Sequence, residues 1–415
     1  MGHNRLTDAD PSKSYPEFLK KAYAGKKVQQ TETKPELIHA GTAEGKKRLQ
    51  QLANDTSVTQ IIDNYGEQYA ELLLSKNAHL YRANYDVQVA SVSELLTKHY
   101  GEKQAWELGS WVFFPWSGQL VHILGQEDFE DLRTIRNRDL ITKDEQAILF
   151  DFRAACFGMS VGSAGALALA ITGISRHIKL IDGAVISGSN LNRILTGVSS
   201  VGKHKAQVIA EKIYEMNPYS EVATYDKVNQ ANVEDILNDE PKTDVVIDEI
   251  DDIEMKVGLR LAARRRKIPV LMATEIGDTI ILDVERFDLE PKRPIFHDLV
   301  PGIETLIDNP PENYREWTKH AVRIIDPRNM SHKMQESLLK IGTTVVTHPQ
   351  LGSTVMATGG VLAFAAKNIA LGNPIKSGRY VISMERQMLA DHQTRAYKRK
   401  HKQHTKVIHK AINSM

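Results

Sequence analysis

Cysteine is the scarcest residue in this 415-residue chain, which contains only Cys156. One cysteine cannot form a disulfide within the chain or a zinc site of paired cysteines, and this fits a reducing cytoplasm. The residues Lys and Arg (53) balance Asp and Glu (52), leaving a formal net charge of +1. No overall field therefore directs the chain to nucleic acid or to a membrane surface.

Long apolar segments are also missing. The N-terminus lacks an apolar signal segment. The most apolar helical run, residues 355–371, contains Lys367 and is too short to span a bilayer. We therefore expect a cytoplasmic protein without a membrane partner.

The remaining composition is that of a globular protein, with 41% hydrophobic and 25% charged residues. This length predicts two or three domains with ample material for a buried core. We expect a polar arm, a small α+β domain, a nucleotide-binding domain, a helical and strand extension of that domain, and a basic tail. These five segments are expected at residues 1–55, 56–128, 129–300, 301–390 and 391–415.

The N-terminal third gives weaker signals. The arm is rich in Lys, Gln and Thr and is expected to be loosely ordered, with a helical piece near residues 15–23. Apolar residues at helical spacing predict one amphipathic helix over residues 58–75 and a second over 87–99. The aromatic-rich run 111–116 predicts a strand paired with 120–124. Its aromatic residues suit the core of a small domain better than a ligand platform.

A strand–turn–helix–strand unit stands at the centre of the chain. An apolar strand leads into a turn that contains Gly158 and Gly162, an Ala/Leu-rich helix follows, and a second strand ends at Asp182. Small residues allow a phosphate to approach the backbone, and the helix N-terminus offers it free N–H groups. A carboxylate about 20 residues further on can accept hydrogen bonds from ribose hydroxyls. This pattern indicates a nucleotide site, although an ordinary tight turn fits the glycines equally well.

Strands and helices then alternate as far as residue 274. We expect strands at 154–157, 178–181, 222–225, 245–247 and 270–273, separated by helices at 164–171, 205–216, 233–237 and 255–265. This alternation is typical of an α/β fold with a Rossmann-like, doubly wound and mostly parallel sheet. A further strand is expected at 279–284, an apolar helix at 355–371 and a strand at 378–384.

Several short motifs follow the glycine turn in a fixed order. They are Ser-Asn-Leu-Asn-Arg at 189–193, Val-Gly-Lys-His-Lys-Ala at 201–206, Met-Asn-Pro at 216–218 and Val-Val-Ile-Asp-Glu-Ile-Asp-Asp at 245–252. In this order and spacing, residues 136–273 resemble the ThiF-type adenylyltransferases, the ubiquitin-activating-enzyme-like and molybdopterin-synthase-adenylyltransferase-like family. The resemblance implies an enzyme that uses ATP and Mg²⁺ to activate a carboxylate, often the C-terminus of a small ubiquitin-like protein.

The resemblance also implies roles for individual residues. Asp182 is expected to contact the ribose and Asp251 to hold Mg²⁺. Arg193 and Lys205 are expected to stabilise the charge on the leaving phosphates. The nucleotide-binding set is Gly158, Ser160, Gly162, Asp182, Asn190, Arg193 and Lys205. Arg138 matches the family arginine that reaches the ATP site of a dimer partner, so a homodimer is expected; a surface arginine is the equal alternative.

Two departures from the family pattern affect this prediction. Met159 and Ser160 stand where many relatives carry glycine. The chain also lacks a later catalytic cysteine, and Cys156 lies within the first nucleotide-site strand, where a buried apolar role is expected. An activated acyl group would therefore pass to an external nucleophile rather than to a cysteine of this chain.

Two other functions remain open. An NAD(P)-dependent oxidoreductase would use the same Rossmann opening, but it would not need Arg193, Lys205 and Asp251 together. A non-catalytic nucleotide-binding module would explain the thin glycine turn.

The spacing of His297, His320 and His348 matches no metal-ligand pattern. The basic tail is expected to be a solvated helix, and nucleic acid is not an expected partner.

Overall fold

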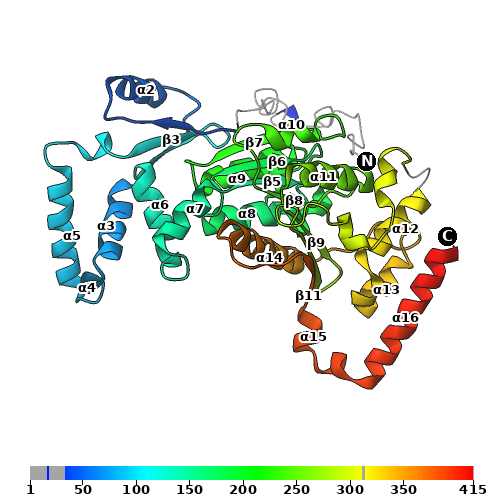
Figure 1. Ribbon diagram of the computed structural model, residues 1–415. Helices are drawn as coiled ribbons and strands as arrows, with labels where there is room; N and C mark the ends of the chain where they lie inside the picture. The colour runs from blue at the N-terminus through cyan, green and yellow to red at the C-terminus, as the bar shows by residue number, and fades with distance from the viewer. Residues whose placement is uncertain (1–15, 18–32, 311–313, 415) are drawn as a thin grey trace. The chain divides into compact units, whose positions relative to one another are not determined.

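Five neighbouring strands of the larger sheet run parallel, as the alternation of strands and helices predicts. The computed structural model describes residues 16–17, 33–310 and 314–414 (Figure 1). The parallel strands are β5 (Arg153–Phe157), β6 (His177–Ile181), β7 (Glu221–Tyr225), β8 (Val245–Asp248) and β9 (Val270–Glu275). The antiparallel strands β10 (Thr279–Glu285) and β11 (Gly378–Ser383) complete the order β11-β10-β9-β8-β5-β6-β7.

The strand order reverses at β5. The chain first adds β6 and β7 on one side of β5 and then adds β8 and β9 on the other side. In such sheets, ligands bind at the carboxyl ends of the strands beside this switch point. The predicted α/β, doubly wound and mostly parallel fold is confirmed, and the switch point lies at the predicted glycine turn.

Helices cover both faces of this sheet. On one face, α8 (Gly162–Thr172) and α14 (Gly352–Ala370) pack closely, since a Cβ atom on Gly359 would lie 2.4 Å from the carbonyl oxygen of Ala164. On the other face, α10 (Val233–Asn238) and α11 (Ile253–Arg266) bury apolar side chains against Phe157 and Val246. Figure 1 shows α8 beside α14, with α10 and α11 across the sheet.

The remaining helices of the larger unit lie between its sheet strands or follow β11. This unit comprises Asp144–Ile209 and the chain from Glu221 onward. Its elements include η4 (Gly188–Asn192), η5 (Val198–Ser200), η6 (Ile295–Asp298), η7 (Ile303–Ile307), α12 (Tyr314–Ile325), η8 (Pro327–Asn329), α13 (His332–Leu338), α15 (Met384–Met388), η9 (Ala390–Gln393) and α16 (Arg395–Ser414). The helix α16 is the expected terminal helix, and it buries Ile408. No helix in the described ranges is long and apolar enough to cross a membrane.

The smaller unit is formed by the chain up to Lys143 together with Ala210–Ser220. Its sheet has the order β1-β3-β4-β2. The strands are β1 (Glu36–Ile38), β2 (Gln60–Asp63), β3 (Ser110–Phe114) and β4 (Gln119–Ile123). The helices are α2 (Ala43–Ala53), α3 (Tyr65–Lys76), α4 (Ala78–Tyr81), α5 (Tyr85–Tyr100), η2 (Ala105–Glu107), α6 (Gln126–Thr134) and η3 (Ile135–Asn137). Two further helices, α7 (Lys143–Asp151) and α9 (Lys205–Met216), have residues in both units.

Two expectations for the N-terminal third are wrong. The segment 36–53, expected as a loosely ordered arm, forms β1 and α2, because β1 pairs with β3. The single helix expected over 58–75 is interrupted, because residues 60–63 pair in parallel with β4 before α3 begins. The helical piece expected near 15–23 falls mainly outside the described residues. The aromatic run of β3 is confirmed as core, since Trp111 and Phe113 are buried.

Candidate nucleotide site

The turn between β5 and α8 requires glycine at its first position. Gly158 has φ +85°, and a Cβ atom there would lie 2.3 Å from the carbonyl oxygen of Glu249 on the loop after β8. Ser163 in the first turn of α8 donates from its Oγ to the carbonyl oxygen of Ser160 at 2.7 Å. Gly162 begins the helix. The turn therefore brings the N-terminus of α8 to the carboxyl ends of β5 and β8, where backbone N–H groups can meet an anion.

Asp182 connects this turn with the start of α9. Its Oδ2 accepts a hydrogen bond from the backbone N–H of Met159 at 2.7 Å, and its Oδ1 accepts from that of Ala184 at 2.7 Å. The Nζ of Lys205 lies 3.9 Å from Oδ2 of Asp182. Both side chains are largely buried, with exposed fractions of 12% for Asp182 and 13% for Lys205. The structure thus brings together two residues that the sequence places 23 positions apart.

Arg193 reaches the glycine turn from the segment after β6. Its Nε donates to Oγ of Ser160 at 3.1 Å, and its Nη1 donates to the carbonyl oxygen of Ser189 at 3.0 Å. Burial lowers the pKa of Arg193, while the negative charges of Asp251 and Glu275 oppose this change. The side chain of Asn190 is buried and accepts a hydrogen bond from the backbone N–H of Ser187, which fixes η4 ahead of Arg193.

Asp251 lies in the loop after β8 and is exposed. In the described part of the chain, no three His, Cys, Asp or Glu side chains are arranged to hold a metal ion. One carboxylate beside a triphosphate is nevertheless a suitable donor set for Mg²⁺, which takes oxygen ligands and keeps several waters. The exposed position of Asp251, whose charge acts on Arg193, fits this kind of site.

Arg138 belongs to the smaller unit. Its Nη2 donates to Oδ1 of Asp131 at 2.8 Å, and its side chain is 48% exposed.

Cys156 is fully buried in β5, and burial raises the pKa of its thiol to about 12. Cys156 is therefore a core residue, as expected, because a thiol with so high a pKa supplies almost no thiolate at neutral pH.

Two glutamates at the site, the half-buried Glu249 and the buried Glu275, were not expected from the sequence. Oε1 of Glu249 accepts a hydrogen bond from the backbone N–H of Ala273 at 2.8 Å, and burial together with the charge of Glu275 raises the pKa of Glu249. Glu275 ends β9 and is 6% exposed; burial raises its pKa to about 7. Within the described residues, Oε1 of Glu275 has no hydrogen-bond partner. One feature of the sequence could have identified them, because both glutamates follow the carboxyl end of a predicted parallel strand.

The segment before α14 also meets the site. Nδ2 of Asn192 donates to the carbonyl oxygen of Gln350 at 3.0 Å. Surrounding protein lowers the pKa of His348, with Asp251 opposing this shift and Arg193 adding to it. His348 is thus close enough to both residues for their charges to affect its pKa, although no sequence motif separates it from the other histidines.

A glycine turn at the switch point, a carboxylate after the second strand and two converging cations define a nucleotide-binding α/β domain. The sequence model of the ThiF family matches residues 133–406. The chain belongs to the ThiF family of adenylyltransferase-like enzymes, which confirms the family predicted from the motifs.

Two curated relatives are similar over part of their lengths. An uncharacterised protein of Mycobacterium tuberculosis (strain CDC 1551 / Oshkosh) is 37% identical over 281 residues, which are 66% of this chain and 38% of the relative. The tRNA threonylcarbamoyladenosine dehydratase of Escherichia coli (strain K12) is 38% identical over 122 residues, 29% of this chain and 44% of the enzyme. The chain therefore spans less than half the length of each of these relatives.

Solved structures of the family show lower overall similarity. The E. coli tRNA N6-threonylcarbamoyladenosine dehydratase in complex with ATP is 24% identical, with a TM-score of 0.40, and the match covers 58% of this chain and 95% of that chain. E. coli MccB with ATP is 18% identical, with a TM-score of 0.38, over 58% of this chain and 66% of that chain.

Proposed function

We propose that the chain is an ATP-dependent adenylyltransferase that converts a carboxylate into an acyl-adenylate. The observation that carries this proposal is the convergence of predicted residues on the N-terminus of α8. Arg193 is hydrogen-bonded to Ser160, and Lys205 lies beside Asp182, whose carboxylate is bonded to the glycine turn. An oxidoreductase would need the turn and the carboxylate, but it would have no use for two cations aimed at phosphates.

The proposed reaction assigns a task to each side chain. A carboxylate oxygen of the substrate attacks the α-phosphorus of ATP, the bond from that phosphorus to the bridging oxygen breaks, and pyrophosphate leaves with the electron pair. Arg193 and Lys205 stabilise the charge that grows on the leaving group. Asp182 accepts from the ribose hydroxyls, and Gly158, Gly162 and Asn190 shape the binding turn. Asp251 holds Mg²⁺, which neutralises phosphate charge when bound.

The second half of the reaction needs an acceptor from outside the chain. Cys156 is the chain's sole cysteine and its thiol is buried in β5. We therefore propose that an external thiol, sulfide, amine or other small nucleophile attacks the acyl-adenylate and releases AMP. The C-terminus of a small ubiquitin-like protein is the first substrate class to test, because the family motifs favour it.

Arg138 carries a separate part of the proposal, which is that it acts in the ATP site of a second copy in a homodimer. Its exposure and its surface ion pair leave it free to exchange partners. The test mixes Arg138→Ala and Arg193→Ala proteins, each inactive alone. Restored turnover is expected, because a mixed dimer regains one intact site; no restoration would contradict the trans role.

ATP–pyrophosphate exchange tests the function itself. Wild type is assayed with Mg²⁺ and a panel of peptides and small proteins ending in Gly-Gly. Exchange should require a carboxylate and should fall at least about 100-fold in Arg193→Ala and in Asp251→Ala. Arg265→Ala, which removes a surface ion pair with Glu234, is the matched control and should keep full exchange.

The other outcomes identify the remaining functions. ATP binding without exchange for any carboxylate would favour a nucleotide-binding module. Binding of NAD(H) but not ATP would overturn the adenylation proposal and favour an oxidoreductase.

A further inference from the structure

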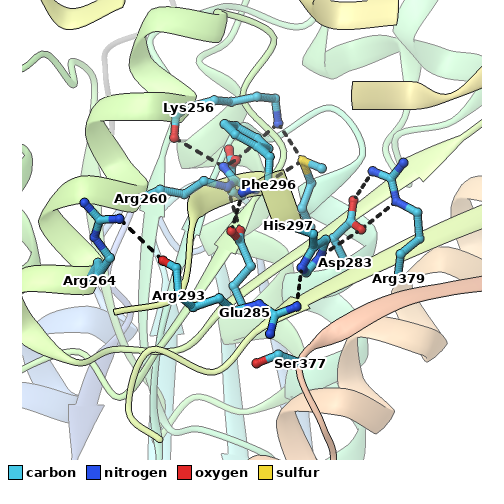
Figure 2. Close-up of polar contacts among 12 residues, drawn as sticks. Lys256, Arg260, Arg264, Asp283, Glu285, Arg293, Phe296, His297, Ser377 and Arg379 are labelled. Carbon is cyan, nitrogen blue, oxygen red and sulfur yellow. Dashed lines mark hydrogen bonds and ion pairs between the residues drawn. The ribbon is translucent and has the colours of Figure 1, made fainter. Parts of the chain in front are cut away.

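A network of buried charges lies at the start of the loop that carries Asp251, and Figure 2 shows its members Lys256, Arg260 and Glu285. Arg260 on α11 is completely buried and pairs with two carboxylates. Its Nη1 donates to Oδ2 of Asp248 at the end of β8, and its Nε donates to Oε2 of Glu285 on β10 at 2.6 Å. The Nζ of Lys256 adds a second cation 3.2 Å from Oδ2 of Asp248. These four residues, Asp248, Lys256, Arg260 and Glu285, are called the Arg260 network below.

The Arg260 network is held firmly in place. The Arg260 guanidinium lies over the ring of Phe296, 3.9 Å from its centroid. The other carboxylate oxygen of Glu285, Oε1, accepts from the backbone N–H of Phe296 at 2.7 Å. Figure 2 shows Phe296 and Glu285 on either side of the Arg260 head group. A guanidinium with so few open directions can hold a carboxylate in one orientation.

Stability alone is a weak reason for such a network. Charges at this depth lose their hydration, and buried ion pairs replaced by well-packed apolar side chains are often as stable. Asp248 and Arg260 have no exposed side-chain surface, and Glu285 has 1%. What the network determines is the geometry of the groups bonded to it.

Asp248 transmits this geometry to the site loop. Its second oxygen, Oδ1, accepts from the backbone N–H of Ile250 at 3.1 Å. On the far side of the loop, Asp252 caps α11 by accepting from the backbone N–H of Met255 at 2.9 Å. Asp251 therefore stands between two residues whose backbone is fixed, one through Arg260 and one through the helix.

We infer that Arg260 is a positioning residue for the ATP–Mg²⁺ complex and acts by holding Asp248 and, through it, the loop of Asp251. Glu285 orients Arg260 from the opposite side. This inference rests on the proposed function, because it takes Asp251 as the Mg²⁺ ligand. It adds a residue that touches neither the nucleotide nor the metal.

Calorimetry of ATP binding, with Mg²⁺ and with a chelator, tests the inference without any carboxylate substrate. Arg260→Met keeps an unbranched apolar stem and removes the charged guanidinium. It should bind metal-free ATP within about twofold of wild type and should lose at least about tenfold of the tightening that Mg²⁺ gives wild type. Arg260→Lys should recover part of that tightening, because a second cation again faces Asp248 beside Lys256.

Arg264→Met is the matched control. Arg264 lies one helical turn further along α11 and pairs with Glu304 rather than with the Arg260 network. Its Mg²⁺ dependence should equal that of wild type. Wild-type Mg²⁺ dependence in Arg260→Met, or an equal loss in Arg264→Met, would overturn the inference.

A second variant covers the case in which Arg260→Met does not fold. Glu285→Gln retains shape and should reduce the Mg²⁺ effect by a smaller factor, about threefold; a value equal to that of wild type would count against the inference. Wild type that binds Mg²⁺–ATP but catalyses no exchange would remove the proposed function and leave this test intact. If the ATP affinity of wild type does not change with Mg²⁺, the inference is overturned directly.

Discussion

Asp248 and Glu275 end neighbouring parallel strands, β8 and β9, and both carboxyl groups are buried. Burial alone raises the pKa of Asp248, but Lys256 and Arg260 outweigh it and hold the pKa below its usual range. Burial raises the pKa of Glu275 to about 7, and the Thr358 hydroxyl together with the charge of Arg193 opposes this only in part. Depth in the protein therefore does not set the charge of these acids; the partners do.

The comparison separates two uses of a buried carboxyl group. Asp248 is an anion in the folded protein, and its carboxylate is held by three partners, Lys256, Arg260 and the backbone N–H of Ile250. Glu275 has an oxygen without a partner among the described residues and changes its charge near neutral pH. The first arrangement suits a structural support, and the second suits a group that responds to a ligand or to pH.

Removing Asp248 should have the largest effect. Asp248→Ala leaves Arg260 and Lys256 facing a buried site without their shared anion, and this kind of change costs about 3–5 kcal/mol. The free energy of unfolding, measured by urea denaturation at pH 7, should fall by that amount. A loss below about 1 kcal/mol would show that Glu285 alone compensates Arg260.

Replacing Glu275 should have the opposite sign. Between its ordinary pKa of 4.5 and about 7, the folded chain holds a proton that the unfolded chain has released. The stabilising contribution of Glu275 is therefore complete below 4.5 and is lost as pH rises through 7. Glu275→Gln should be more stable than wild type by about 3 kcal/mol at pH 8 and by only about 1 kcal/mol at pH 5.

Urea denaturation of both proteins at the two pH values measures this difference. The sign of the stability difference between Glu275→Gln and wild type at pH 8 decides between the two protonation states. A glutamine variant that is less stable than wild type at pH 8 would mean that Glu275 is ionised and paired in the folded protein.

The smallest effect is expected at the surface. Arg265 pairs with Glu234, but its side chain is 58% exposed. Water and salt screen such pairs, so Arg265→Ala should change the free energy of unfolding by less than about 1 kcal/mol. Thermal or urea unfolding at two salt concentrations would check this. A larger loss of unfolding free energy would show that the Arg265 pair stabilises the fold as a buried pair does.

The sequence predicted the parts of this molecule that depend on local pattern. The strand and helix alternation from β5 to β9 and the glycine turn at Gly158 are as predicted, because buried parallel strands read as apolar runs between helices. Asp182 and Lys205 lie side by side, and Arg193 reaches the same glycine turn through Ser160. The roles that the family resemblance implies for these residues stay predictions. The short edge strands were not predicted. β1 has three residues and β2 has four, which are too few to show the alternation of a strand.

The Arg260 network and Glu275 were beyond prediction for a physical reason. Arg260 meets Glu285, 25 positions later, only because β10 turns back antiparallel to β9. Glu249 and Glu275 appear in the sequence as ordinary polar residues after strands, and their coupling follows from the pairing of β8 with β9. These contacts depend on the order of the strands in the sheet, which the sequence alone does not reveal.

The most direct test of adenylation follows oxygen. A carboxylate that supports exchange is labelled with ¹⁸O in its carboxyl group and incubated with the protein, ATP, Mg²⁺ and hydroxylamine as the acceptor. Hydroxylamine attacks the acyl carbon, the bond from that carbon to the phosphate oxygen breaks, and AMP leaves with the labelled oxygen. Adenylation of the carboxylate should yield AMP carrying one ¹⁸O, detected by mass spectrometry. Label in inorganic phosphate, with ADP as the other product, would show phosphoryl transfer and contradict it.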